Sequence, residues 1–252
     1  MTLPGYQEVL LSLVLVALAF GISRWWRLPV SKEIVTGSVR SFVQLVAVGY
    51  ALELIFDLKS IWVILLAIAV MIVVGAQAAC HRVTQLKRPF GIVLAAMSVG
   101  SLATLGSMLA VGVISMKARY VIPLAGMIIS NAMNAAAISM ERVCSDICSR
   151  RDMIETSLSL GKTWREAVSG LISNAIVAGM IFILNFMKTV GIIALPGAMT
   201  GMILAGASPL EAVLLQVIVA YMLVSAVTLT AVMAVELTVR RFFTSAHQLR
   251  PE

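Results

Sequence analysis

The sequence predicts an all-α integral membrane protein with about seven transmembrane helices, a short re-entrant or outer hairpin, and one short cytoplasmic helix. Two observations predict this fold class. Hydrophobic residues make up 60% of the 252 residues and charged residues only 12%, which leaves too little polar surface to cover a soluble globule. Apolar runs of about 20 residues, the length that crosses a bilayer, follow one another with short connections. We therefore expect a single transmembrane domain over residues 1–252.

Hydropathy places each span in turn. The predicted spans are residues 6–23, 34–56, 61–79, 90–114, 120–142, 167–187 and 209–238. The first run has no Lys or Arg ahead of it, so we interpret it as a genuine span and not as a cleaved signal peptide.

Basic residues in the loops predict the orientation. With the N-terminus outside, the inner loops hold Arg24, Arg27, Lys32, Arg82, Lys87, Arg88, Arg142, Arg150, Arg151, Lys162, Arg165, Arg240, Arg241 and Arg250. The outer loops hold only Lys59, Lys117, Arg119 and Lys188. This asymmetry follows the positive-inside rule and predicts a multi-pass protein of the plasma (bacterial inner) membrane with a cytoplasmic C-terminus. The formal charge of +7 therefore reports topology, and no nucleic acid partner is expected.

Residues 191–206 form an apolar run that is too short for a span and is broken by Pro196. One interpretation is a re-entrant element or outer hairpin that forms a gate, with Gly191, Pro196, Gly197 and Gly201 as its key residues, because irregular backbone at membrane depth must line protein or water. The other is a tight packing turn, because Gly197 and Gly201 have GxxxG spacing.

The longest polar stretch joins the fifth and sixth spans, and its residues 150–166 predict two helices with a sharp bend. Asp152 can cap a short helix with Glu155 in the capping-box position, and Gly161 can end that helix in a left-handed conformation. Thr163 and Glu166 predict a second capping box that starts the sixth span. The apolar positions Ile154, Leu158 and Leu160 are predicted to dock into a groove on a partner.

The run ETSLSLG (155–161) resembles the EAAxxxG signature of ABC importer-type permeases, the coupling loop that contacts the ATPase subunit. Glu155 and Gly161 match that signature, whereas Thr156 and Ser157 replace its alanines and its apolar-Pro end is absent. The resemblance implies that Glu155, Leu158, Leu160, Gly161 and Trp164 couple the chain to an ATPase. The GKT at 161–163 lacks the earlier glycine and the strand of a phosphate-binding loop, so ATP and Mg are expected on a partner subunit and no cofactor on this chain.

Three segments extend the resemblance to the FetB family of ABC permeases. They are VIPLAGMIISNAM (121–133), KTVGIIALPGAMTGMILAGASPLEA (188–212) and RRFFTSAHQL (240–249). The resemblance implies a permease that exports iron together with a FetA-like ATPase, with plant relatives linked to aluminium tolerance. It also implies a homodimer of the permease, surrounded by membrane lipid, with a metal ion as substrate.

Polar groups within spans are candidates for the substrate pathway, because each is costly in lipid unless it is paired or hydrated. Asn131 and Asn134 share one face of the fifth span with Met127, and a metal ion could meet their amide oxygens and the thioethers of Met127 and Met133. Hydrogen bonding between helices by the two asparagines is the structural alternative. Glu141 could gather a cation at the inner entrance.

Other candidate groups lie near helix ends. Glu53 could attract a cation at the outer exit, and a solvated surface role is the alternative for this acid and for Glu141. Cys144 and Cys148 have i, i+4 spacing on a helical extension, so a cytosolic metal-loading site is conceivable, but no standard zinc spacing is present. The transported ion is left open.

Two other classes of protein compete with an ABC permease for iron or for a different substrate. An ion-coupled secondary transporter usually needs a carboxylate or histidine near the membrane midplane, and His81 and His247 are both at inner helix ends. An intramembrane hydrolase needs a nucleophile or metal motif, and the sequence has no HExxH and no GxSxG.

Overall fold

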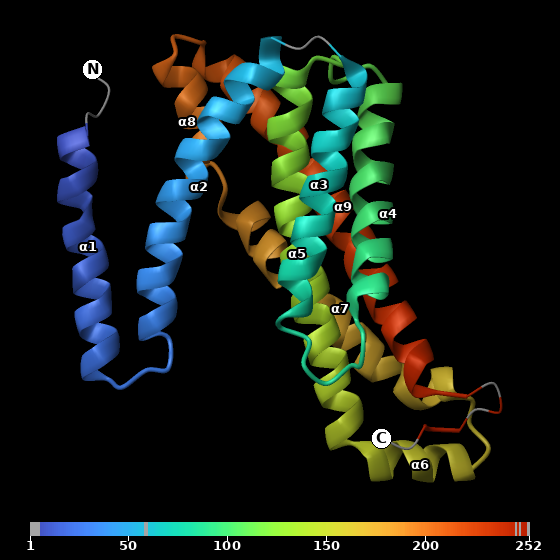
Figure 1. Ribbon diagram of the computed structural model, residues 1–252. Helices are drawn as coiled ribbons and strands as arrows, with labels where there is room; N and C mark the ends of the chain where they lie inside the picture. Colours follow the sequence, from blue (N-terminus) through green and yellow to red (C-terminus); the bar gives the residue numbers. More distant parts are fainter. Residues whose placement is uncertain (1–5, 58–59, 245, 247, 251–252) are drawn as a thin grey trace. The chain divides into compact units, whose positions relative to one another are not determined.

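The computed structural model describes all residues except 1–5, 58–59, 245, 247 and 251–252, so Lys59 and His247 lie outside the described residues. The chain forms two compact units, residues 1–59 and 60–252, which we call unit 1 and unit 2. Unit 1 consists of α1 (Tyr6–Trp25) and α2 (Ser31–Asp57), joined by a short turn (Figure 1).

Unit 2 holds the remaining helices. They are α3 (Ile61–Cys80), α4 (Phe90–Ala110), α5 (Ala118–Ser149), α6 (Arg151–Ser159), α7 (Trp164–Thr189), α8 (Gly197–Leu204) and α9 (Pro209–Phe242). Six helices of the described chain, α2, α3, α4, α5, α7 and α9, are long and apolar enough to cross a membrane, and Leu11–Trp25 of α1 is a shorter apolar helix. The predicted fold class of about seven apolar helices is confirmed, and no strand is present among the described residues.

The helix bounds differ from the predicted spans mainly at the ends. The fifth helix is 32 residues long and the last is 34, against the roughly 20 residues that a bilayer requires. Both helices are therefore longer than a bilayer requires. The fifth helix adds residues 143–149 after its predicted end, and the last helix ends at Phe242, four residues after its predicted end at 238. The fourth helix ends at Ala110, four residues before its predicted end at 114.

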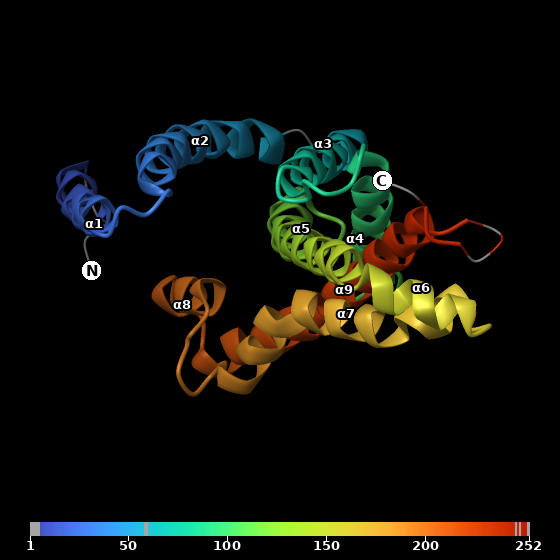
Figure 2. The same cartoon turned by 90° about the horizontal axis from the view of Figure 1, so that it is seen from below.

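Helix α5 forms the centre of unit 2. Figure 2 shows α5 among α3, α4, α7 and α9, and its buried residues recur along the whole helix from Val121 to Ile147. Small residues bring the backbones close together: a Cβ atom added at Gly179 of α7 would lie 2.9 Å from the Ala135 carbonyl oxygen of α5. This close approach fixes α7, and with it the connection to α6, against the central helix.

The two short helices lie at opposite ends of unit 2. Helix α6 lies at one end, runs across the axes of the longer helices, and is separated from α5 only by Arg150 (Figure 1). Helix α8 lies at the other end, beside the beginning of α9 (Figure 1). We refer to these as the α6 end and the α8 end.

Candidate functional site

The bend after α6 is set by Gly161, as the sequence predicts. Its φ of +86° lies in the left-handed region that favours glycine. The Gly161 N–H donates to the Leu158 carbonyl at 3.0 Å and the Lys162 N–H to the Ser157 carbonyl at 3.2 Å, which is the Schellman arrangement. Nothing lies within 4 Å of where a Cβ atom would sit, so Gly161 is required for its conformation and leaves an exposed corner.

The start of α6 differs from the prediction. The helix begins at Arg151 with Arg150 as its N-cap residue and no side-chain cap bond, so the predicted Asp152 cap is wrong. Only Arg150 separates α5 from α6, and the break therefore falls before Asp152 can act as a cap. Glu155 is instead held by Arg151, whose Nε lies 2.9 Å from Glu155 Oε1.

The apolar residues of α6 divide between the interior and the surface. Ile154 is completely buried and anchors α6 to unit 2, so the expectation that it docks into a partner is wrong. Leu158 is half-buried, whereas Leu160 is 78% exposed. A groove of about 450 Å³ lies beside α6, lined by Glu155, Leu158, Ser159, Lys162 and the tail residues Ala246, Gln248 and Leu249. The surface available to a partner is therefore Leu160, Gly161 and this groove.

The start of α7 is tied to the end of α9. The predicted capping box is confirmed, because the Thr163 side chain accepts from the Glu166 N–H and the Glu166 carboxylate accepts from the Thr163 N–H at 2.8 Å. The Trp164 ring stacks on Phe243, with ring centroids 5.7 Å apart and an interplanar angle of 22°. Trp164 is half-buried, so most of its contact is with its own chain.

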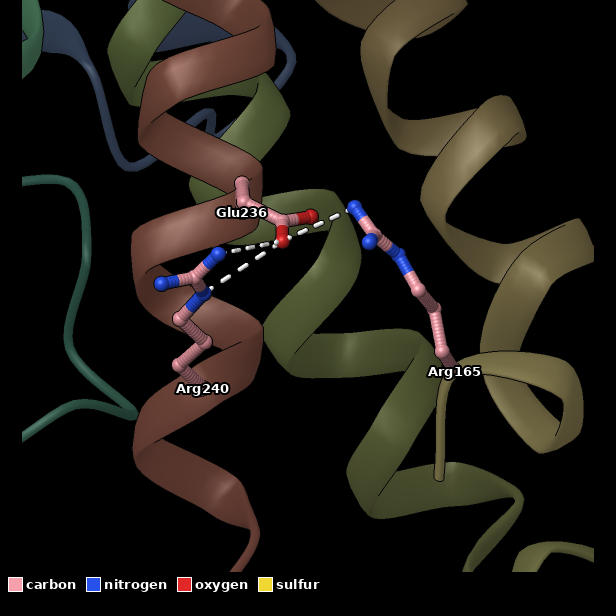
Figure 3. Close-up of polar contacts among 3 residues, drawn as sticks. All are labelled: Arg165, Glu236 and Arg240. Atoms are coloured by element: carbon pink, nitrogen blue, oxygen red, sulfur yellow. Dashed lines mark hydrogen bonds and ion pairs between the residues drawn. The ribbon is translucent and has the colours of Figure 1, made fainter. Parts of the chain in front are cut away.

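Glu236 links the same two helices electrostatically (Figure 3). Its Oε1 lies 3.0 Å from Arg165 Nη2 of α7 and 3.1 Å from Arg240 Nη2 of α9, and its side chain is 19% exposed. This ion cluster and the Trp164–Phe243 stack together hold the α6–α7 connection against α9, and we call these two contacts the clamp. Sequence reasoning missed Glu236; its i, i+4 spacing with Arg240 is the only signal, because Arg165 is 71 residues away.

One side of α5 is not covered by the other helices of unit 2. Its members are exposed or half-buried and recur every three or four residues: Pro123, Met127, Ser130, Asn134, Ile138, Glu141, Ser145 and Cys148. We call this set the α5 stripe. Polar groups facing lipid are costly, so a stripe with Ser130, Asn134 and Glu141 is suited to water, an ion or another protein chain.

The predicted pathway residues of α5 separate into two groups. Met127, Asn134 and Glu141 belong to the α5 stripe, and half-buried Asn131 borders it, with its Nδ2 donating to the Met127 carbonyl at 2.8 Å. Met133 lies one residue, or about 100°, around the helix from Asn134 and is therefore off the stripe. Within the described part of the chain, neither asparagine hydrogen-bonds to another helix, so the alternative of interhelical bonding is not observed here.

Two further candidates, Glu53 and Cys144, do not belong to the α5 stripe. Glu53 is exposed on α2 in unit 1. Cys144 is completely buried in α5 while Cys148 is exposed, so the two thiols differ in access to solvent. No three His, Cys, Asp or Glu side chains gather in the described residues.

The segment between α7 and α9 lines a cavity at the α8 end. Gly191 adopts a φ of +82°, and its N–H donates to the Ala194 carbonyl at 3.0 Å, which closes a tight turn. Pro196 precedes α8, an eight-residue helix that is too short to cross a bilayer. A Cβ atom at Gly197 or Gly201 would meet nothing within 4 Å, so these two glycines do not bring α8 into close contact with another helix among the described residues.

This cavity has a volume of about 390 Å³. Its lining residues are Met187, Val190, Gly191, Leu195, Met199, Val213, Gln216, Val217, Ala220 and Tyr221. Gln216, only 7% exposed, is its buried polar group. Of the predicted gate residues, Gly191 therefore lines a cavity directly, whereas Pro196, Gly197 and Gly201 do not appear in its wall.

Comparison with known proteins places the whole chain in one family. The model of the uncharacterised protein family UPF0014 matches residues 6–243. The chain is 37% identical over 250 residues to the protein ALUMINUM SENSITIVE 3 of Arabidopsis thaliana, covering 98% of this chain and 91% of that protein. It is 36% identical over 247 residues to the membrane protein STAR2 of Oryza sativa, with 98% and 87% covered.

A bacterial relative extends the match. The chain is 35% identical over 243 residues to the probable iron export permease protein FetB of Escherichia coli, covering 96% of this chain and 94% of that protein. No solved structure matches. The resemblance to FetB and to the plant aluminium proteins is confirmed over nearly the full length, and the chain belongs to the UPF0014 family of membrane proteins.

Proposed function

We propose that this chain is the permease subunit of an ABC transporter that exports a metal ion, with iron as the first candidate. A separate FetA-like ATPase binds ATP and Mg and supplies the energy. The single observation that supports this most strongly is the exposed corner at Leu160 and Gly161, which lies at the position of the coupling signature. The full-length match to a probable iron export permease supports the choice of substrate.

The α6 end is the ATPase-facing end in this proposal, which corresponds to a cytoplasmic C-terminus and an outer N-terminus in the plasma membrane. Leu160, Gly161 and the groove beside α6 contact the ATPase, and Glu155, which lines the groove, pairs with Arg151 one turn earlier on the same helix. A movement of the corner passes into α7 directly and into α9 through Glu236 and the Trp164–Phe243 stack. The clamp makes α6, α7 and α9 respond as one body.

The α5 stripe is the substrate pathway in this proposal. Amide and hydroxyl oxygens at Asn134 and Ser130 suit a hydrated cation, and Glu141 near the α6 end increases its local concentration. No other helix of unit 2 covers the stripe, and a second copy of the chain is proposed to cover it and form a homodimer whose two stripes enclose the pathway. The cavity at Gly191 and Gln216 would form its outer opening.

The experiment that tests this function is ATPase activity of the chain co-purified with its ATPase in lipid bilayers. Activity is titrated with Fe(II), Fe(III), Al(III) and Cu(I), with a metal-free control. Stimulation by one ion supports both the ABC assignment and that substrate. Failure to co-purify with any ATPase, together with metal transport driven by a proton or sodium gradient, would overturn the assignment in favour of a secondary transporter.

A further inference from the structure

A second cavity lies at the α6 end, and Cys148 is the one residue of the α5 stripe that belongs to its described wall. Its volume is about 720 Å³. The loop between α3 and α4, the ends of α5 and α9, the start of α6 and the C-terminal tail all contribute to its wall: Gln85, Leu86, Lys87, Ile147, Cys148, Arg151, Arg241, Phe242, Leu249 and Arg250. The corner residues Leu160 and Gly161 and the pathway residues Asn134 and Glu141 do not belong to its wall.

Four positively charged residues from four separate segments line the cavity. They are Lys87 of the α3–α4 loop, Arg151 of α6, Arg241 of α9 and Arg250 of the tail. No Asp or Glu belongs to its wall in the described part of the chain. Glu155 pairs with Arg151, but its side chain is 52% exposed and lines the neighbouring groove. Like charges placed around one cavity repel, so the arrangement favours an anionic ligand.

The positions of these residues are fixed by backbone contacts. The Arg250 N–H donates to the Phe242 carbonyl at 2.8 Å, which folds the tail back along α9. Arg241 Nη1 donates to the Lys87 carbonyl at 3.3 Å, and Arg151 Nη2 donates to the Arg250 carbonyl at 3.2 Å. A guanidinium has five N–H donors, so each arginine keeps donors for an oxyanion in addition to these contacts.

The level of the cavity along α5 matches the lipid headgroups. Tyr120 is an exposed aromatic residue near the start of α5, of the kind that is enriched at membrane interfaces, and Ile147 of the cavity wall is 27 residues further along. At 1.5 Å per residue this separation is about 40 Å, close to the thickness of a bilayer including its headgroups. Leu86, Phe242 and Leu249 give the cavity apolar wall beside its charges, as a glycerophospholipid requires.

We propose that this cavity binds the phosphate group of an anionic phospholipid on the α6 side of the membrane. The ligand chemistry is a phosphate oxyanion held by Lys87, Arg241 and Arg250, with the adjoining glycerol and acyl carbons against the apolar wall. Bound lipid would hold the C-terminal tail of the chain against α9 and so stabilise the neighbouring Trp164–Phe243 contact. This proposal depends on membrane insertion and not on the transported ion or the ATPase.

The test compares two double variants of the full chain. Arg241→Gln with Arg250→Gln removes two charges from the cavity, and Arg82→Gln with Arg88→Gln removes two charges from the neighbouring loop outside it. Each protein is purified in detergent and titrated with phosphatidylglycerol and, separately, with phosphatidylcholine. Bound lipid is counted by native mass spectrometry, and circular dichroism checks that each variant is folded.

The wild-type chain and the loop variant are expected to retain phosphatidylglycerol, while the cavity variant loses roughly thirtyfold in affinity, the effect of two cations near an anionic surface. Arg241→Lys should retain most of the affinity for phosphatidylglycerol because it keeps the charge. If the cavity double variant is unfolded, the single variant Arg241→Gln takes its place, and it should show a smaller loss of affinity. Equal losses in the two double variants would overturn the proposal in favour of diffuse surface charge. Tight binding of inorganic phosphate or pyrophosphate in the absence of lipid would overturn the proposal that the phosphate group belongs to a phospholipid.

Discussion

Replacing Gly100 with alanine should separate α4 from α9. A Cβ atom at Gly100 would overlap Thr230 Oγ1 and would lie 2.9 Å from the Ala226 carbonyl oxygen and 3.1 Å from the Thr230 backbone nitrogen. Rotating the threonine side chain would relieve only the first contact, because the other two atoms belong to the α9 backbone. The helices themselves must therefore move apart.

The magnitude follows from two opposing effects. Overpacking of a well-packed contact costs about 1–3 kcal/mol, and a backbone clash points to the upper value. Gly→Ala in a helix gains about 1 kcal/mol in backbone entropy and propensity. We expect Gly100→Ala to lower the free energy of unfolding by about 2 kcal/mol. Gly106→Ala on the same helix, where nothing lies within 4 Å, should raise it by up to about 1 kcal/mol.

The assay is equilibrium unfolding in mixed micelles of mild detergent and sodium dodecyl sulfate, followed by circular dichroism. The double variant Gly100→Ala with Thr230→Ala should recover part of the loss, because it removes the overlap with the threonine hydroxyl and leaves the contact with the Ala226 carbonyl oxygen. Equal stability of Gly100→Ala and Gly106→Ala would refute the close approach of α4 and α9.

Three further predictions concern coupling and transport. Gly161→Val should insert into the membrane normally but uncouple ATPase activity from transport, because a left-handed φ is strained for a branched residue; loss of insertion would count against a coupling role. Glu236→Gln and Arg165→Gln should each cost only about 1 kcal/mol in stability, since the arginines are largely exposed, yet both should lower metal-stimulated ATPase activity. Unchanged stimulation in both variants would remove the clamp from the mechanism. Met127→Leu, on the α5 stripe, should weaken metal stimulation, whereas Met133→Leu, off the stripe, should not; the opposite ranking would move the pathway to another face of α5.

The features predicted correctly from the sequence are those whose cause is local. Apolar runs set the helices, Gly161 sets the bend after α6, and Thr163 with Glu166 starts α7, because each signal lies within a few residues of its effect. The face shared by Met127 and Asn134 follows from helical periodicity alone.

The features missed depend on distant residues. Asp152 has the right spacing for a cap, but the direct continuation of α5 into α6 moves the helix start ahead of it. Ile154 looks like a docking residue until the burial of α6 against the bundle is known. The ion pair between Arg165 and Glu236 joins residues that are 71 positions apart in the sequence, and no local pattern indicates such a pair.

The central claim is that the corner after α6 contacts a separate ATPase, and single-cysteine cross-linking tests it most directly. Leu160→Cys and Leu195→Cys are both made in a background without the native cysteines; both positions are exposed, at 78% and 61%, but lie near opposite ends of unit 2. We predict that Leu160→Cys cross-links to the co-expressed ATPase subunit, with a yield that changes on adding ATP, and that Leu195→Cys does not. Equal cross-linking at both positions, or none at Leu160→Cys in an intact complex, would contradict the account.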